Sequence, residues 1–103
     1  MPVKAFIPIH PRKYEKLVDE LYDEWQNPNP LAQEPLILEE RDRNGHLVHV
    51  YVVWSKWAQL DGIDRSEIIM DAAEKKLSPP DLLEITIAMG LTQDEGKRMG
   101  IIS

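Results

Sequence analysis

The alternation of apolar and polar residues is clearest over residues 36–54, LILEERDRNGHLVHVYVVW, where two strand-like runs flank Asn44-Gly45. Asn-Gly between such runs strongly predicts a β-hairpin, because a type I′ turn needs positive φ at both central residues. A two-residue turn also fixes the register, so residues whose numbers sum to 89 face each other. The expected pairs are Asp42 with Leu47, Arg41 with Val48, Glu40 with His49, Leu38 with Tyr51, and Ile37 with Val52.

The two strands of this hairpin differ in polarity. The second is apolar on both faces, which predicts a central strand that is covered on both sides. The first ends in the charged run 39–43, which is typical of a protected edge strand. Residues 3–7 are the expected partner on the free side of the second strand. Antiparallel pairing there would give a split βαβ unit.

Residues 12–26 carry the clearest helical period. An apolar stripe predicts one buried side, and core packing is the favoured interpretation over an aromatic ligand wall. The stripe comprises Tyr14, Leu17, Val18, Leu21, Tyr22 and Trp25. The opposite side is acidic and comprises Glu15, Asp19, Glu20, Asp23 and Glu24. Asn27-Pro28 ends the helix, because a residue before proline is disfavoured in the helical region.

Three helix starts are expected after the hairpin. Asp64 is the predicted N-cap of the first, with Glu67 as its capping-box partner and Ile63 and Ile68 as a hydrophobic staple. Ser78-Pro79 opens a helix expected to continue over residues 82–89. Thr92 and Glu95 form a capping box for a short last helix. The pattern therefore predicts one α+β domain over residues 1–103. A small antiparallel sheet, with three strands if the split βαβ unit forms, packs with three to four helices.

Composition narrows the class of protein. The 103 residues include no cysteine, which excludes disulfides and thiolate chemistry and fits a reducing compartment. The longest apolar run is far too short to span a membrane, and the apolar patch near residue 1 is too short for a signal peptide, so a cytoplasmic location is expected. A net charge of −6 disfavours nucleic-acid binding and favours either simple solubility or a basic protein partner.

The histidines are the first candidates for chemistry. His46 and His49 are three apart, so on a strand they point to opposite faces, and no metal site or cofactor is expected. The register instead places Glu40 opposite His49, with Tyr51 on the same face. A general acid–base dyad or a pH-sensitive contact is one interpretation. A cross-strand polar pair contributing at most about 1 kcal/mol is the favoured one.

Aromatic residues and the C-terminal third supply two further candidates. Trp25 and Trp57 would form a binding surface if they line an exposed groove, and a core position for Trp57 is equally expected. Residues 82–100 superficially resemble a helix-turn-helix. Gly96 stands where that motif needs an apolar packing residue, and acidic residues accompany Lys97 and Arg98.

The favoured functional hypothesis is a non-catalytic, cytoplasmic protein-interaction or regulatory module, because no nucleophile elbow or phosphate-binding loop is present. Its partner surface would be the acidic helix side or the Trp57 region. The partner could also be a second copy of the same chain. The first alternative is a small enzyme or a small-molecule binder that uses Glu40, His49 and Tyr51. The second alternative is DNA binding by residues 82–100.

Overall fold

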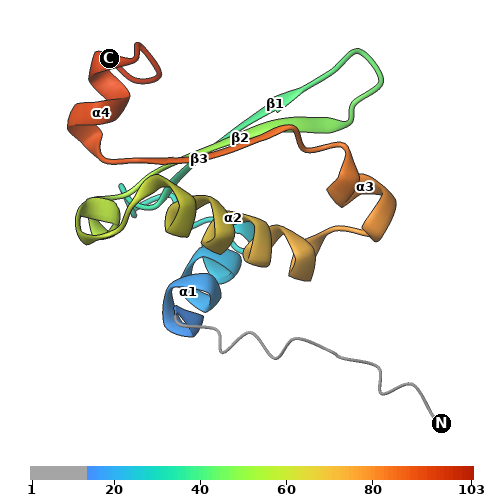
Figure 1. Cartoon of the computed structure of the whole chain (residues 1–103), viewed down its shortest axis with the longest axis horizontal. Coiled ribbons are helices and arrows are strands. Elements are labelled where there is room, and N and C mark those ends of the chain that lie inside the picture. Colours follow the sequence, from blue (N-terminus) through green and yellow to red (C-terminus); the bar gives the residue numbers. More distant parts are fainter. Residues whose placement is uncertain (1–13) are drawn as a thin grey trace, which may run out of the picture.

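The computed structural model describes residues 14–103 (Figure 1). Its elements are α1 (Glu15–Gln26), β1 (Leu36–Arg41), β2 (Leu47–Val53), the 3-10 helix η1 (Ser55–Gln59), α2 (Gly62–Lys76), α3 (Pro79–Leu83), β3 (Ile87–Leu91) and α4 (Gln93–Arg98). The strands form one mixed sheet in the order β1-β2-β3. The α+β class, the hairpin and the number of helices are confirmed.

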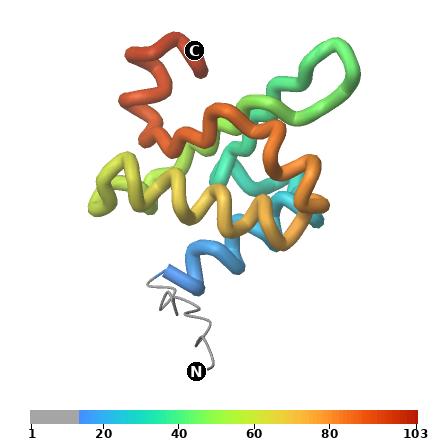
Figure 2. Tube along the Cα trace, turned by 45° about the vertical axis from the view of Figure 1, so that its right-hand side comes forward, coloured from blue at the N-terminus to red at the C-terminus, as the bar shows by residue number. Residues whose placement is uncertain are grey.

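Helices α1 and α2 lie on one side of the sheet, whereas α4 lies on the other side at one end (Figure 1). The chain path in Figure 2 shows α2 running beside β3. Hydrogen bonds tie these two elements together, because Ser66 Oγ donates to the Ala88 carbonyl at 2.7 Å and Arg65 Nη1 donates to the Gly90 carbonyl at 3.2 Å. Because α4 lies at one end of the sheet, the face opposite α1 and α2 has a helix over only part of its length.

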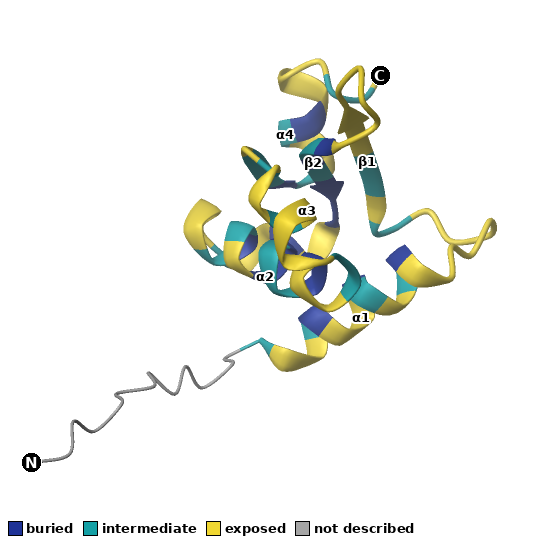
Figure 3. Ribbon diagram, turned by 90° about the vertical axis from the view of Figure 1, so that its right-hand side faces the viewer, coloured by how far each residue is buried: buried dark blue, intermediate teal, exposed yellow. Residues whose placement is uncertain are grey.

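The core lies between the sheet and the helices α1 and α2 (Figure 3). The predicted stripe of α1 is confirmed, with Val18, Leu21 and Trp25 buried. These side chains meet Val50 and Val52 of β2 and the apolar side of α2, which comprises Ile68, Ile69, Ala72 and Ala73. Burying a large aliphatic side chain contributes about 1.5–3 kcal/mol, so this layer is the main source of stability.

The hairpin loop is longer than predicted. Gly45 has a φ of +82°, but no residue other than glycine has positive φ in the described chain, so the type I′ turn is wrong. The Asp42 amide donates to the His46 carbonyl and the Gly45 amide donates to the Asp42 carbonyl, each at 3.0 Å. This is a three-residue loop with glycine in its left-handed position. The Asp42 carboxylate accepts from the amides of Asn44 and His46 and stabilises the loop.

A β-bulge restores the predicted register. A three-residue loop alone would shift every pair by one residue, and Arg41 indeed faces Leu47 instead of Val48. The register then shifts so that Glu40 faces His49, and the pairs Leu38–Tyr51 and Ile37–Val52 follow as predicted. The extra residue also explains why Leu47 joins Val50 in the core, although simple alternation places them on opposite faces.

The third strand comes from a different part of the chain than predicted. β3 pairs in parallel with β2, with His49 facing Ile87 and Tyr51 facing Met89. The predicted helix over residues 82–89 is therefore wrong, because α3 ends at Leu83. The β-branched run Ile85-Thr86-Ile87 was the signal for a strand. The predicted strand over residues 3–7 lies outside the described residues.

The helix starts are partly as predicted. Asp61 is the N-cap of α2 and its side chain accepts from the Asp64 amide at 2.8 Å, so the assignment of Asp64 as the cap is wrong. Ser78 caps α3 and the Thr92–Glu95 capping box opens α4, as predicted. Within residues 14–103, no helix is long and apolar enough to cross a membrane.

Candidate interaction surfaces

Glu40, His49 and Tyr51 come together on the face of the sheet that is turned away from α1 and α2. His49 Nδ1 lies 3.2 Å from Glu40 Oε1, which is the contact expected from the register. The rings of His49 and Tyr51 meet edge-on with centroids 6.3 Å apart. The Glu40 side chain is 58% exposed, so water screens its charge and the pair contributes at most about 1 kcal/mol.

Within this cluster, the pKa of Tyr51 is shifted upwards. Desolvation raises the pKa of its hydroxyl above the usual value of 10.0, and the neighbouring Glu40 carboxylate raises it further. Tyr51 is therefore a neutral hydrogen-bond donor at physiological pH. The two depressions described below are not lined by any of these three residues. The cluster lies on the open surface of the sheet, outside both of these depressions.

A larger partly apolar surface surrounds this cluster, and we call it the open sheet face. It comprises Leu36, Leu38 and Glu40 of β1, His49 and Tyr51 of β2, and Ile87 and Met89 of β3, all at least partly exposed. Gly96 of α4 packs near Val53, so α4 covers only the far end of β2. The expectation that both faces of the second hairpin strand are covered is therefore wrong at His49 and Tyr51.

The two tryptophans proposed as a binding surface are both buried. Trp57 is 0% exposed, and its indole N–H donates to the Val52 carbonyl at 2.9 Å while its ring packs edge-on against Trp54. Trp25 is 7% exposed, and Lys76 Nζ lies 5.9 Å from its ring centroid. Neither indole lines an exposed groove, so the condition for that binding surface is not met.

The acidic side of α1 is largely occupied by contacts within the chain. Asp19 binds Lys75 of α2, and Glu20 binds Lys56 of η1 at 2.6 Å. The Glu24 carboxylate accepts from the Asn29 amide at 2.8 Å. These contacts neutralise part of the negative charge on which the basic-partner hypothesis for this helix depends.

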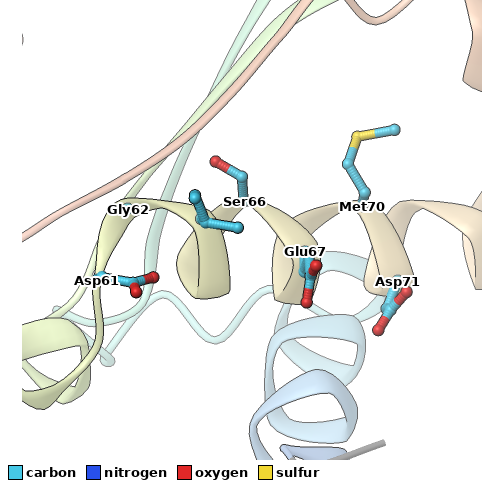
Figure 4. Close-up of a pocket in the computed structure, with 7 residues that line it drawn as sticks. Asp61, Gly62, Ser66, Glu67, Met70 and Asp71 are labelled. Carbon is cyan, nitrogen blue, oxygen red and sulfur yellow. The ribbon is translucent and has the colours of Figure 1, made fainter. Parts of the chain in front are cut away.

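A depression of about 730 Å³ lies along α2, and we call it the α2 groove (Figure 4). It is lined by Asp61, Gly62, Ile63, Ser66, Glu67, Met70 and Asp71. In Figure 4, Ser66 and Met70 point to one edge of the groove and Glu67 and Asp71 point to the opposite edge. Ile63 is 73% exposed. The groove was missed because Ile63 was assigned to a hydrophobic staple, whereas positions 63, 66, 67 and 70 share a second side of the helix.

A second depression of about 510 Å³ lies between η1 and α4, and its lining includes Arg65, Glu95 and Arg98. Arg65 Nη1 donates to Glu95 Oε1 at 2.7 Å. The amide of Thr92 and this guanidinium hold the pKa of Glu95 at about 2. Nearby, Glu34 accepts from the Ser55 hydroxyl at 2.7 Å, which lowers the pKa of Glu34. Hydrogen bonds within the chain therefore engage both carboxylates and lower the pKa of each, and these contacts hold neighbouring segments together.

Residues 82–100, which superficially resemble a helix-turn-helix in sequence, do not form one, because Ile87–Leu91 is a strand and α4 has only six residues. The DNA-binding alternative loses the two packed helices that it requires. Within the described residues, no group of three or more histidine or carboxylate side chains is arranged to hold a metal ion. His46 contacts Asp42, whereas His49 contacts Glu40.

Comparison of the chain with protein-family models, curated proteins and solved structures finds no match in any of the three.

Proposed function

We propose that the protein is a non-catalytic, cytoplasmic interaction module that binds a partner protein through the open sheet face. One observation carries this proposal. Leu38 faces Tyr51 and Tyr51 faces Met89, so one apolar row crosses all three strands without a helix above it. Glu40, His49 and Ile87 form the adjacent row. An uncovered apolar patch with a polar border is typical of a protein-binding surface.

Tyr51 stands at the centre of both the sheet and the patch. Tyrosine is enriched among the residues that dominate binding free energy, because it combines a large rigid ring with a hydrogen-bond donor. The neighbouring Glu40–His49 pair would fix the orientation of the partner and contribute little affinity. The absence of cysteine supports the cytoplasmic location.

Photo-crosslinking in cells that naturally make the protein tests this proposal. A benzophenone amino acid at Met89 is expected to give a discrete protein adduct, and Tyr51→Ser is expected to abolish it. The same amino acid at Lys16, an exposed position of α1, is the control. Equal labelling at the two positions would contradict the proposal. The mass of the adduct separates a second copy of the chain from a different partner.

The second candidate is a small enzyme or ligand-binding protein that uses Glu40, His49 and Tyr51. The 3.2 Å contact and the raised pKa of Tyr51 favour it. Glu40→Gln removes a charge that raises this pKa, so the Tyr51 titration is expected to shift towards 10.0, as followed by NMR of the tyrosine ring. A small molecule that binds saturably at these rings would favour this candidate over the interaction module.

A further inference from the structure

The α2 groove combines the exposed Ile63 and the partly exposed Met70 with carboxylates that make no ion pair within residues 14–103. Ile63 is 73% exposed, and Met70 lies two turns further along the same side of α2. Asp61, Glu67 and Asp71 line the same groove. Glu67 and Asp71 are separated by one turn, and like charges at this spacing destabilise a helix by about 0.2–0.5 kcal/mol.

Every basic residue of α2 is engaged outside this groove. Arg65 binds Glu95 of α4, and Lys75 binds Asp19 of α1. Lys76 donates to the Gln26 side chain at 2.7 Å and lies over the Trp25 ring. Within residues 14–103, the three groove carboxylates therefore make no ion pair. This contrasts with the acidic side of α1, where Asp19 and Glu20 are both paired.

We propose that the α2 groove is a docking site for a basic segment of a partner protein that carries an apolar anchor. The anchor packs on Ile63 and Met70, and lysine or arginine side chains beside it meet Glu67 and Asp71. This proposal rests on the interaction function proposed above, but it uses a different surface. Substitutions on the open sheet face therefore leave docking in the groove unchanged.

The negative charge of the groove favours some classes of binding partner over others. A second copy of the chain would place Asp61, Glu67 and Asp71 of two molecules near one another, and each chain has a net charge of −6. Nucleic acids and anionic lipids would meet the same repulsion. A basic segment offsets the repulsion among the groove carboxylates and also covers the exposed Ile63. The groove therefore favours a cationic partner over a homodimer.

Selection from a displayed library of random 12-residue peptides, panned on the full chain, tests the proposal. Lysine or arginine beside a large apolar residue is expected to be enriched. Titrations of the best peptide, followed by tryptophan fluorescence or calorimetry, are expected to weaken about tenfold with Ile63→Ser, and with Glu67→Gln combined with Asp71→Asn. The matched control is Leu83→Ser, because Leu83 is an 84% exposed leucine on α3 outside the groove.

Three results would overturn the proposal. The first is a set of selected peptides without cationic residues, or with affinity that Ile63→Ser and Leu83→Ser reduce equally. The second is a dimer in sedimentation that Ile63→Ser dissociates, which would assign the groove to a second copy. The third is tighter peptide binding after Lys4, Arg12 and Lys13 are replaced by glutamine, which would assign the groove to the chain's own basic residues. Loss of crosslinking at the open sheet face affects none of these results.

Discussion

Arg65 of α2 donates through Nη1 to Glu95 Oε1 of α4 at 2.7 Å, so one ion pair joins the two helices on either side of β3. The guanidinium also donates to the carbonyls of Leu60 and Gly90. The Arg65 side chain is only 10% exposed. These three acceptors stabilise the charge of the buried guanidinium. Removing any one of them would leave a buried N–H donor without a hydrogen-bond partner.

Glu95 is expected to make stability depend on pH in acid. Its pKa is held at about 2 by the Thr92 amide and by Arg65, below the ordinary value of 4.5. Because the folded pKa is the lower one, this stabilisation is complete above pH 4.5 and is lost as pH falls towards 2. Between these limits the wild type is expected to lose about 1 kcal/mol more free energy of unfolding than Glu95→Gln, after solvent screening. Urea unfolding at several pH values measures the difference.

The control for this prediction is Asp94→Asn, which removes a neighbouring exposed carboxylate and leaves the ion pair with Arg65 intact. Its pH dependence is expected to follow the wild type. Parallel pH profiles for the wild type and Glu95→Gln would contradict the role assigned to Glu95.

Gly90→Ala is expected to destabilise the fold by about 1–3 kcal/mol, because the added Cβ would overpack the core. That atom would lie 2.7 Å from Arg65 Cβ and 2.9 Å from Trp57 Nε1, and neither neighbour can move freely. Gly62→Ala is the matched control, since its Cβ would meet nothing within 4 Å. Thermal and urea unfolding of the two variants measure the difference, and equal stabilities would refute the close packing at Gly90.

The three-residue hairpin loop and a type I′ turn make different predictions for substitutions at Asn44 and Gly45. Gly45→Ala is expected to cost about 1 kcal/mol, because alanine is strained at a φ of +82°. Asn44→Ala is expected to change stability by less than about 0.5 kcal/mol, because Asn44 does not have positive φ. A type I′ turn would make both substitutions costly. Urea unfolding distinguishes the two loops.

Tryptophan-to-phenylalanine substitutions at positions 57 and 25 are expected to differ in cost. Both remove the same volume from buried sites, but only the Trp57 indole N–H has a partner, the Val52 carbonyl. The Trp25 Nε1 has no hydrogen-bond partner among the described residues. Trp57→Phe is therefore expected to cost about 1 kcal/mol more than Trp25→Phe. Equal free energies of unfolding would show that the Trp57 hydrogen bond contributes nothing.

The sequence alone predicted the structure best where partners lie close along the chain. Local spacing sets the apolar stripe of α1 and the Thr92–Glu95 capping box. One short loop sets the pairing of Glu40 with His49 across the hairpin. The predicted hairpin register is correct from Glu40–His49 to the base of the hairpin, whereas the turn and the pairs next to it are wrong. The three-residue loop displaces the strands by one residue, and the bulge beside His49 compensates for that displacement.

Only the tertiary structure decided which distant segments meet. Tyr51 pairs with Met89 in β3 although no local pattern links the two strands, and residues 82–89 fit a helix equally well by periodicity. Trp57 is buried because β3 and α2 close over it, and the acids of α1 are paired because lysines from η1 and α2 reach them. The α2 groove stays acidic because the cations of α2 are used elsewhere. Such pairings depend on packing summed over many residues, which the residues flanking each segment do not encode.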